Sequence, residues 1–142
     1  RTTEKQDAIV KEISDYLMMI TGQKPKVCNA RISVSGFKLR EGMPVGLMVT
    51  LRGKRMNDFI DRFVNITLPR TRDFWGISKK HFDKKGNLCY GIKEAQIFPE
   101  LAKETIKTPF GLEICFTTNA KNKEEGIKLF ELLKFPLAKD KN

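Results

Sequence analysis

Three stretches of the chain carry apolar residues at helical spacing and are predicted to form helices: residues 3–21, 56–64 and 123–134. Gly22 follows the first stretch, where helices often end in a left-handed residue, and Pro69 ends the second. An Asn122 to Glu125 pattern is typical of the cap that would begin the third. Each apolar stripe is one-sided, so each helix is expected to bury one face and expose the other.

Apolar and polar residues alternate with period two between these helices, which predicts strands. The alternation is cleanest in residues 45–52, with Val45, Leu47, Val49 and Leu51 on one face and Gly46, Met48, Thr50 and Arg52 on the other. One face is predicted to be core and the other to meet a ligand. Weaker alternation predicts further strands at 26–31, 88–92 and 112–118. Gly, Pro and charged residues predict a long exposed loop at 32–44 and an irregular surface segment at 70–87.

This order of elements predicts an α+β fold in which one antiparallel-rich sheet has helices on one face and leaves the other face open for RNA. The 142 residues, 40% of them hydrophobic, suffice for a single domain spanning residues 1–142 with a real core. No apolar run approaches the roughly 18 residues of a membrane span, and no signal peptide is recognisable, so a soluble protein without membrane contact is expected.

The net positive charge of the chain is confined to two segments. Residues 21–55 hold eight Lys or Arg and one acid, Glu41, while residues 70–85 hold six Lys or Arg and two acids. Together the two segments carry a net charge of +11, whereas the whole chain carries +10. A solvated surface without a partner would intersperse acids among these cations, so a polyanion-binding surface is the favoured interpretation.

Sequence patterns of catalytic, metal and nucleotide sites are missing. The one histidine, His81, has no nucleophile or orienting acid in a recognised pattern beside it. The glycines match neither the P-loop nor the dinucleotide fingerprint, and no acids are spaced for metal or acid–base work. The three cysteines, Cys28, Cys89 and Cys115, form no C-x-x-C pair and are interpreted as reduced strand residues. We expect no catalytic residue, no metal and no cofactor.

Phe37 differs from the other phenylalanines. It lies in a polar loop that offers no core, so stacking on a base, insertion at an interface and local packing all stay open. Phe59 and Phe63, by contrast, have helical spacing and are expected in the core. Lys and Arg would contact phosphate groups, while base edges, sugars or 2′-hydroxyls could be read by Gln23, Asn29 and Thr50.

A series of longer motifs then runs along the chain in one order: TGQKP at 21–25, SGFKLREGMPVG at 35–46, VTLRG at 49–53, LPRTRDF at 68–74, FD at 82–83, GN at 86–87, GIKE at 91–94, IFPE at 97–100, TT at 117–118 and FP at 135–136. These motifs closely resemble the bacterial-type L five family of large-subunit ribosomal proteins. The likeness covers nearly the whole chain from about residue 15.

The resemblance implies a structural, non-enzymatic protein of the central protuberance that binds 5S rRNA and large-subunit rRNA. Resemblance and charge together assign the 5S rRNA contact to Gln23, Lys24, Lys26, Phe37, Thr50 and Arg52. A loop toward the peptidyl-site tRNA would include Ser33, Ser35, Gly36, Lys38 and Arg40. Other rRNA contacts are expected at Arg31, Arg55, Arg70, Arg72, Lys79 and Lys80. Further implied partners are neighbouring central-protuberance proteins and a small-subunit head protein at an intersubunit bridge.

Departures from the family pattern favour an organellar ribosome. Family members usually begin with a further N-terminal segment that includes a strand, and nothing in this sequence matches it. Asn29 and Ile32 stand where basic residues are common in the family, and Trp75 stands where Arg is frequent. We therefore expect a ribosome of an organelle, a mitochondrion rather than a plastid, with the bacterial cytoplasm as the alternative. In an organelle, another RNA could replace 5S rRNA.

Two other function classes stay open from the residues alone. A non-ribosomal RNA-binding protein or RNA chaperone could use the same basic face, and it would bind many RNAs with similar affinity. An enzyme on an α+β scaffold would need a convergent polar pocket, for which the sequence offers no candidate.

Overall fold

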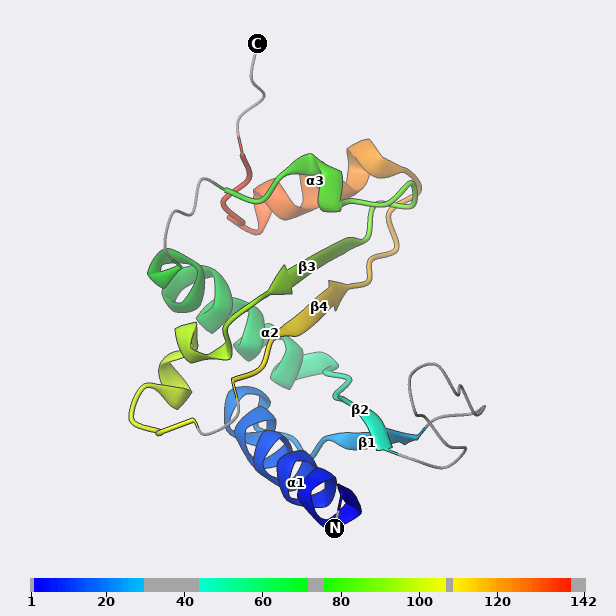
Figure 1. Ribbon diagram of the computed structural model, residues 1–142. Coiled ribbons are helices and arrows are strands. Elements are labelled where there is room, and N and C mark those ends of the chain that lie inside the picture. Colours follow the sequence, from blue (N-terminus) through cyan, green and yellow to red (C-terminus); the bar gives the residue numbers. More distant parts are fainter. Residues whose placement is uncertain (1, 30–43, 72–75, 107–108, 139–142) are drawn as a thin grey trace. The chain divides into compact units, whose positions relative to one another are not determined.

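The computed structural model describes residues 2–29, 44–71, 76–106 and 109–138 (Figure 1). The chain divides into two compact units, Arg1–Phe59 with Lys103–Thr108 and Ile60–Ala102 with Pro109–Asn142. Their boundary in the sequence falls inside one helix, α2, Gly53–Arg62. The expectation of a single domain stays a prediction, because two compact units can still unfold as one cooperative whole.

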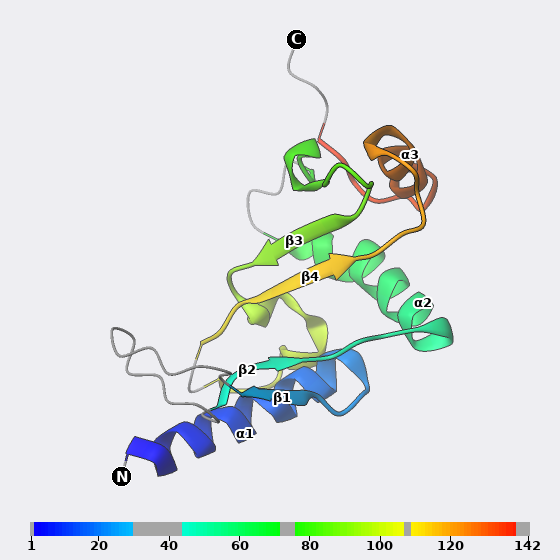
Figure 2. The same ribbon diagram turned by 90° about the vertical axis from the view of Figure 1, so that its right-hand side faces the viewer.

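The first unit combines helix α1, Thr2–Thr21, with strands β1, Lys26–Asn29, and β2, Pro44–Met48. The strands are antiparallel, and Lys26 lies opposite Met48. The register shifts next to Asn29, so the ladder is short and irregular. Helix α1 runs beside this ladder and contacts β2 (Figures 1 and 2).

The predicted first helix is confirmed, including its end. Gly22 follows the helix with a φ of 75°, which a residue without a Cβ adopts easily, and its amide donates to the Met18 carbonyl over 2.7 Å. Tyr16 and Ile20 are buried, as the apolar stripe requires. The Tyr16 hydroxyl bonds with Glu12 and with the carbonyl of Thr105, which ties the returning segment to α1.

The predicted second helix is also confirmed and continues further than its apolar stripe. Helix α2 passes into a π-helical turn, Phe63–Thr67, and then into a 3-10 turn, Leu68–Arg70. Pro69 lies in the first positions of that last turn, where its missing N–H costs nothing, and the backbone is extended at Thr71. Phe59 and Phe63 are 7% and 1% exposed, which confirms them as core residues.

The second unit contains strands β3, Leu88–Ile92, and β4, Leu112–Phe116, and helix α3, Lys123–Leu132. The two strands are antiparallel in unbroken register, with Leu88 opposite Phe116 and Ile92 opposite Leu112. One face of the ladder is buried, because six phenylalanines contact one another there and around it: Phe63, Phe82, Phe98, Phe116, Phe130 and Phe135. The other face carries exposed residues.

Helix α3 begins as predicted, since the Asn122 side chain accepts a hydrogen bond of 2.9 Å from the Glu125 amide. Phe130 is buried, whereas Leu133, expected in the same buried stripe, is 43% exposed. The reason is that α3 ends at Leu132 and Lys134 takes a φ of 66°, so the periodicity of the helix no longer directs Leu133 inward.

The α+β class is confirmed, but the expected single sheet is replaced by two ladders. Among the residues that the structure describes, β1 pairs with β2 and β3 with β4. The strand predicted at 45–52 ends at Met48, because the Gln23 side chain donates a hydrogen bond to the Thr50 carbonyl and Gly53 turns the chain with a φ of 63°. The strand predicted at 112–118 ends at Phe116, because the Asn87 side chain accepts the Thr118 amide. No helix in the described ranges is long and apolar enough to cross a membrane.

Candidate nucleic-acid interface

The described part of the chain contains just over half of the predicted RNA-contacting residues: Gln23, Lys24, Lys26, Thr50, Arg52 and Arg55 in the first unit, and Arg70, Lys79 and Lys80 in the second. The other predicted contacts lie outside the described residues: Arg31, Ser33, Ser35, Gly36, Phe37, Lys38, Arg40 and Arg72. The first unit therefore supplies most of the geometry that bears on RNA binding.

Gln23 forms hydrogen bonds with two other predicted contact residues, Thr50 and Arg55. Its Nε2 donates to the carbonyl of Thr50 over 3.0 Å, and its Oε1 accepts from Nη1 of Arg55 over 3.2 Å. These two partners fix which end of the amide faces which neighbour. These two bonds position the Gln23 amide, and its expected role in reading base edges stays a prediction. One N–H and one oxygen lone pair stay available for a ligand.

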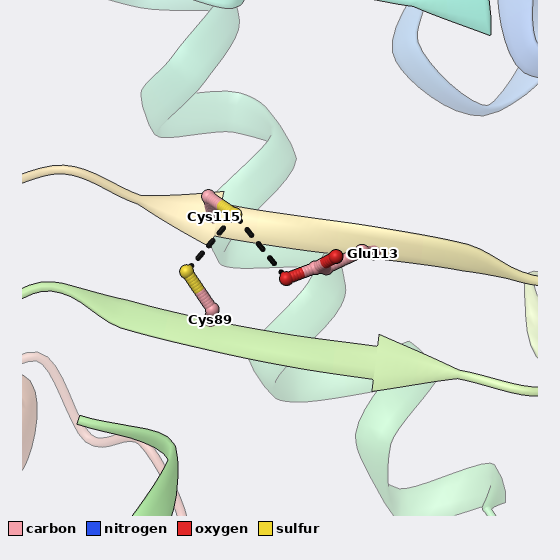
Figure 3. Close-up of side chains that lie close together, drawn as sticks. All are labelled: Cys89, Glu113 and Cys115. Atoms are coloured by element: carbon pink, nitrogen blue, oxygen red, sulfur yellow. Dashed lines mark hydrogen bonds between the residues drawn. The ribbon is translucent and has the colours of Figure 1, made fainter. Parts of the chain in front are cut away.

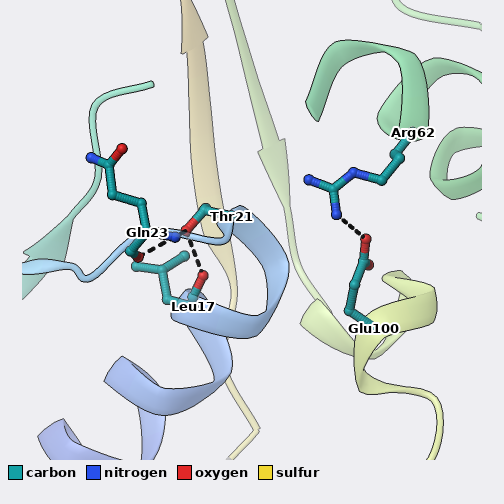
Figure 4. A network of polar contacts seen from close by, with 5 residues as sticks. All are labelled: Leu17, Thr21, Gln23, Arg62 and Glu100. Carbon is teal, nitrogen blue, oxygen red and sulfur yellow. Dashed lines mark hydrogen bonds and ion pairs between the residues drawn. The ribbon is translucent and has the colours of Figure 1, made fainter. Parts of the chain in front are cut away.

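Thr21 holds Gln23 in place from the end of α1. Its side chain is within hydrogen-bonding distance of the Leu17 carbonyl, 2.9 Å, and of the Gln23 carbonyl, 3.1 Å (Figure 4). The Gln23 amide donates back to the Thr21 hydroxyl oxygen over 3.2 Å. Thr21 is 8% exposed, so this link is largely shielded from water. The helix end, the connection and the segment after β2 are thereby linked by side-chain hydrogen bonds.

The alternation predicted for residues 45–52 is confirmed in its exposure even beyond the strand. Gly46, Met48, Thr50 and Arg52 are exposed, while Leu47, Val49 and Leu51 are half-buried. Lys26 lies opposite Met48 and is exposed as well. An uncovered face that carries Thr, Met, Lys and Arg is thus present on the first unit, where an RNA platform is expected.

Within the described ranges, no acidic side chain pairs with the cations of this face. Among the described residues, the ion pairs join Arg62 to Glu100 (Figure 4) and Lys128 to Glu131, and neither involves the contact set of the first unit. Lys24, Lys26, Arg52 and Arg55 are all exposed. Unneutralised cations at short sequence spacing repel one another, and a polyanion relieves that repulsion by releasing its counterions.

The second basic segment is organised by Asp83 rather than left irregular. The Asp83 carboxylate accepts from the Lys85 amide at 2.9 Å, from the Asn87 amide at 2.8 Å and from the Asn87 side chain at 3.0 Å. These bonds, led by the one from the Asn87 backbone, lower the pKa of Asp83 below its ordinary value. A short 3-10 turn, Lys79–His81, precedes it, with the Ser78 hydroxyl accepting from the Lys80 amide.

Comparison with known proteins identifies the family. A sequence model that describes the C-terminus of the ribosomal protein L five family matches residues 44–137. A large ribosomal subunit protein uL5 of Ralstonia pickettii is 49% identical over 128 residues, covering 90% of this chain and 71% of that protein. The uL5 of Dehalococcoides mccartyi is 52% identical over 87% of this chain and 69% of its own length. The uL5 of Desulfatibacillum aliphaticivorans is 50% identical, with coverages of 95% and 75%. The chain belongs to the ribosomal protein L five family.

Membership in the L five family makes this chain a ribosomal protein, a structural constituent of the large subunit with rRNA among its partners. The resemblance seen in the sequence and the expectation of a non-enzyme are both confirmed. The relatives named above are bacterial, so they give no support to an organellar ribosome.

The histidine of this L five family chain forms a ring contact with a tyrosine rather than a catalytic pair. His81 is exposed and packs edge-on against Tyr90 with ring centroids 5.5 Å apart. Burial raises the pKa of Tyr90 above its ordinary value. This arrangement supplies an aromatic edge beside Lys79 and Lys80 and no nucleophile.

One cluster of side chains, which includes two cysteines, was not predicted from the sequence because its members are far apart along the chain. Cys89 and Cys115 are separated by 26 positions, yet they lie directly opposite each other on β3 and β4 with their sulfurs 3.0 Å apart (Figure 3). The hydrogen bond with Cys89, followed by desolvation and the nearby negative charge of Glu113, raises the pKa of the Cys115 thiol to about 12. Only the strand register brings these groups together.

Proposed function

We propose that this chain binds 5S rRNA through the exposed face of its first unit, as a constituent of the central protuberance of the large ribosomal subunit. The contact set comprises Gln23, Lys24, Lys26, Phe37, Thr50 and Arg52, while Arg31 and Arg55 are proposed as other rRNA contacts. The observation that supports the proposal is a group of exposed cations around Gln23, Thr50 and Arg55, which are joined by hydrogen bonds. Among the described residues, these cations take part in no ion pair. The chain that carries them belongs to a ribosomal family.

The physical basis of the contact is electrostatic, with a specific part added to it. Lys24, Lys26 and Arg52 bind phosphate groups and set the register of the protein on the RNA. The free hydrogen-bonding capacity of Gln23 and the Thr50 hydroxyl read sugars or base edges. Because Gln23 is fixed by Thr21 and Thr50, its remaining N–H has a defined direction before RNA binds.

Two further contacts extend this proposal to the rest of the ribosome. The loop containing Ser33, Ser35, Gly36, Lys38 and Arg40 approaches the peptidyl-site tRNA, and a small-subunit head protein is met at an intersubunit bridge. The second basic segment binds large-subunit rRNA through Arg70, Arg72, Lys79 and Lys80, among neighbouring proteins of the central protuberance. The Asp83 turn supports this role because it orders the backbone that follows Lys79 and Lys80.

The ribosome proposed here is of the bacterial type. The uL5 proteins of Ralstonia pickettii and Dehalococcoides mccartyi are about half identical to this chain over most of its length, which favours a bacterial cytoplasm. An RNA of the bacterial 5S type is therefore the probe of choice.

The test measures binding of the full chain to 5S rRNA and to an unrelated structured RNA of equal length, across a salt series. If phosphate contacts alone hold the RNA, the logarithm of the binding constant falls with the logarithm of the salt concentration by roughly 0.7 to 0.9 per contact, whatever the RNA. We expect 5S rRNA to keep its advantage as salt rises. Equal affinities that fall together would contradict the proposal and favour a general RNA-binding protein or RNA chaperone.

Variants separate the positioning contacts from the specific ones. Arg52→Gln should weaken binding to both RNAs and reduce the salt slope by about one contact. Phe37→Ala should cost about 1–3 kcal/mol of 5S affinity if the ring stacks on a base, with thermal stability nearly unchanged. Lys11→Gln is the matched control, since Lys11 is an exposed cation of the same unit outside the contact set. An effect of Lys11→Gln equal to that of Arg52→Gln would mean that the face has no special role.

A further inference from the structure

The exposed face of the β3–β4 ladder gathers two thiols and one carboxylate, groups that are all common ligands of zinc. Cys89 lies opposite Cys115, and Glu113 lies two residues before Cys115 on the same strand, so all three side chains leave the same face. The Cys89 and Cys115 sulfurs are 3.0 Å apart, and the Cys115 sulfur is 3.7 Å from Oε1 of Glu113. Figure 3 shows the three side chains directed toward one another.

The neighbouring position on this face carries no side chain. Two adjacent cross-strand pairs, Cys89 with Cys115 and Gly91 with Glu113, form the four corners of a patch on the ladder. Gly91 is exposed and a Cβ built on it would meet no atom within 4 Å. Three corners thus offer a ligand atom, while the fourth offers open space.

We propose that Cys89, Glu113 and Cys115 form a binding site for a single Zn²⁺ ion, with the fourth coordination position open above Gly91. Thiolates favour zinc over hard cations such as Mg²⁺ and Ca²⁺, and a carboxylate is a common additional zinc ligand. Three protein ligands and one open position taken by water is an established arrangement for this metal.

The distances suit a tetrahedral ion after small side-chain rotations. With Zn–S bonds of about 2.3 Å and Zn–O bonds of about 2.1 Å, tetrahedral geometry places two sulfurs roughly 3.8 Å apart and a sulfur and an oxygen roughly 3.6 Å apart. The Cys115 sulfur and the Glu113 oxygen already meet this spacing at 3.7 Å. The two sulfurs must separate by somewhat less than 1 Å from 3.0 Å, and rotation of the exposed Cys115 side chain can supply this separation, while Cys89 is half-buried.

The ladder itself is a firm support for such a site. Its register is unbroken over five residue pairs, and its opposite face is fixed by Leu88, Ile92 and the phenylalanine cluster. The ligand positions are therefore held by the backbone and do not depend on RNA. The proposal stands apart from the proposed RNA contact, whose residues in the first unit it does not use.

The test uses the full chain, reduced, with Zn²⁺ alone competing against a chromophoric chelator. We expect one zinc ion per chain, and Cd²⁺ in its place should give an ultraviolet thiolate charge-transfer band. Because loss of a supporting residue alone typically costs about 10–100-fold in metal affinity, Cys89→Ser or Cys115→Ser should each cost more than about 100-fold, and Glu113→Gln about 10-fold.

Two further variants separate a built site from general thiol reactivity. Gly91→Cys adds a ligand at the open corner and should tighten zinc binding by about 10-fold or more, a gain that loss of fold cannot imitate. Cys28→Ser should leave affinity unchanged, since Cys28 lies on β1 in the first unit. Circular dichroism checks that each variant is folded.

Several results would overturn the proposal. Zinc binding that survives Cys89→Ser, or that falls equally with Cys28→Ser, would place the metal elsewhere. An unchanged affinity of Gly91→Cys would show that the ion does not sit over this patch. Formation of a Cys89–Cys115 disulfide in place of zinc uptake, despite the reductant, would make the pair a redox couple and not a metal site.

Discussion

The two ladders of this protein are stabilised in different ways. β3–β4 is regular, and its inner face is sealed by large side chains such as Leu88, which is fully buried. β1–β2 is shorter and bulged, and its residues Val27 and Met48 are 41% and 50% exposed. What links its end to α1 is a set of hydrogen bonds from Thr21 and Gln23.

The two units also differ in how many of their apolar side chains are buried. The buried hydrophobic residues of the described chain fall mostly in the second unit, whereas the first unit has more of the exposed large apolar side chains, among them Met18, Met19 and Met56. A surface that exposes apolar and cationic side chains together is suited to a large polyanionic partner. Most of the buried apolar core therefore lies in the second unit, and most of the exposed large apolar side chains lie in the first.

Replacement of Phe63 by Ala tests this contrast with the largest expected effect. Phe63 is 1% exposed, stacks on Phe98 and contacts Phe116 at a tilt, so its loss should leave a cavity and cost about 3–5 kcal/mol of unfolding free energy in urea titrations. Met48→Ala on the first ladder is the control and should change stability by no more than about 0.5 kcal/mol. Equal losses would abolish the distinction between the two regions.

Glycine contacts sharpen the comparison next. A Cβ at Gly126 would collide with the backbone of Gly86, whereas a Cβ at Gly46 on β2 would meet nothing within 4 Å. Gly126→Ala should therefore destabilise the protein by about 1–3 kcal/mol, even though Ala favours a helix over Gly by about 1 kcal/mol. Gly46→Ala should leave the stability nearly unchanged, and thermal melts of both variants measure the difference. A stabilised Gly126→Ala protein would mean that α3 does not pack closely on the turn at Gly86.

The hydrogen-bonded link of the first unit is expected to contribute less. Thr21→Val removes the hydroxyl that the Gln23 amide and the Leu17 carbonyl share, and it should cost about 1–2 kcal/mol by chemical denaturation. It should also weaken binding to 5S rRNA, because Gln23 loses its fixed direction. Thr50→Val keeps the carbonyl that Gln23 uses and serves as the stability control. Unchanged stability of Thr21→Val would assign the link to packing alone.

The smallest effect concerns the Asp83 turn and its pH dependence. The pKa of Asp83 is lower in the folded chain than in the unfolded chain, so the ionised carboxylate stabilises the fold at pH values above the ordinary carboxyl pKa of 3.8. This contribution is lost as the pH falls below 3.8 toward the pKa of the folded state. Melting temperatures of the wild type and Asp83→Asn should differ at neutral pH and converge in acid. A difference that persists after acidification would exclude the carboxylate charge as its cause.

Local patterns in the sequence predicted a substantial part of this structure. The helices, their ends at Gly22 and Asn122, the core positions Phe59 and Phe63 and the exposed face from Gly46 to Arg52 follow from periodicity and capping. These features depend on residues a few positions apart, which is why they can be read from one chain. The motifs along the chain also pointed to the family that the comparisons then established.

Only the tertiary structure decided which distant residues meet. Strand alternation says nothing about partners, so the division into two ladders, the Gln23–Thr50 bond across 27 positions and the pairing of Cys89 with Cys115 were not predictable. Two strands are shorter than alternation predicted, because the Gln23 side chain donates to the Thr50 carbonyl and the Asn87 side chain accepts from the Thr118 amide. The sequence by itself determined the local elements and the charge that suits RNA, because both are properties of neighbouring residues. The fold determined the sites, because a site is made by residues that the chain brings together from far apart.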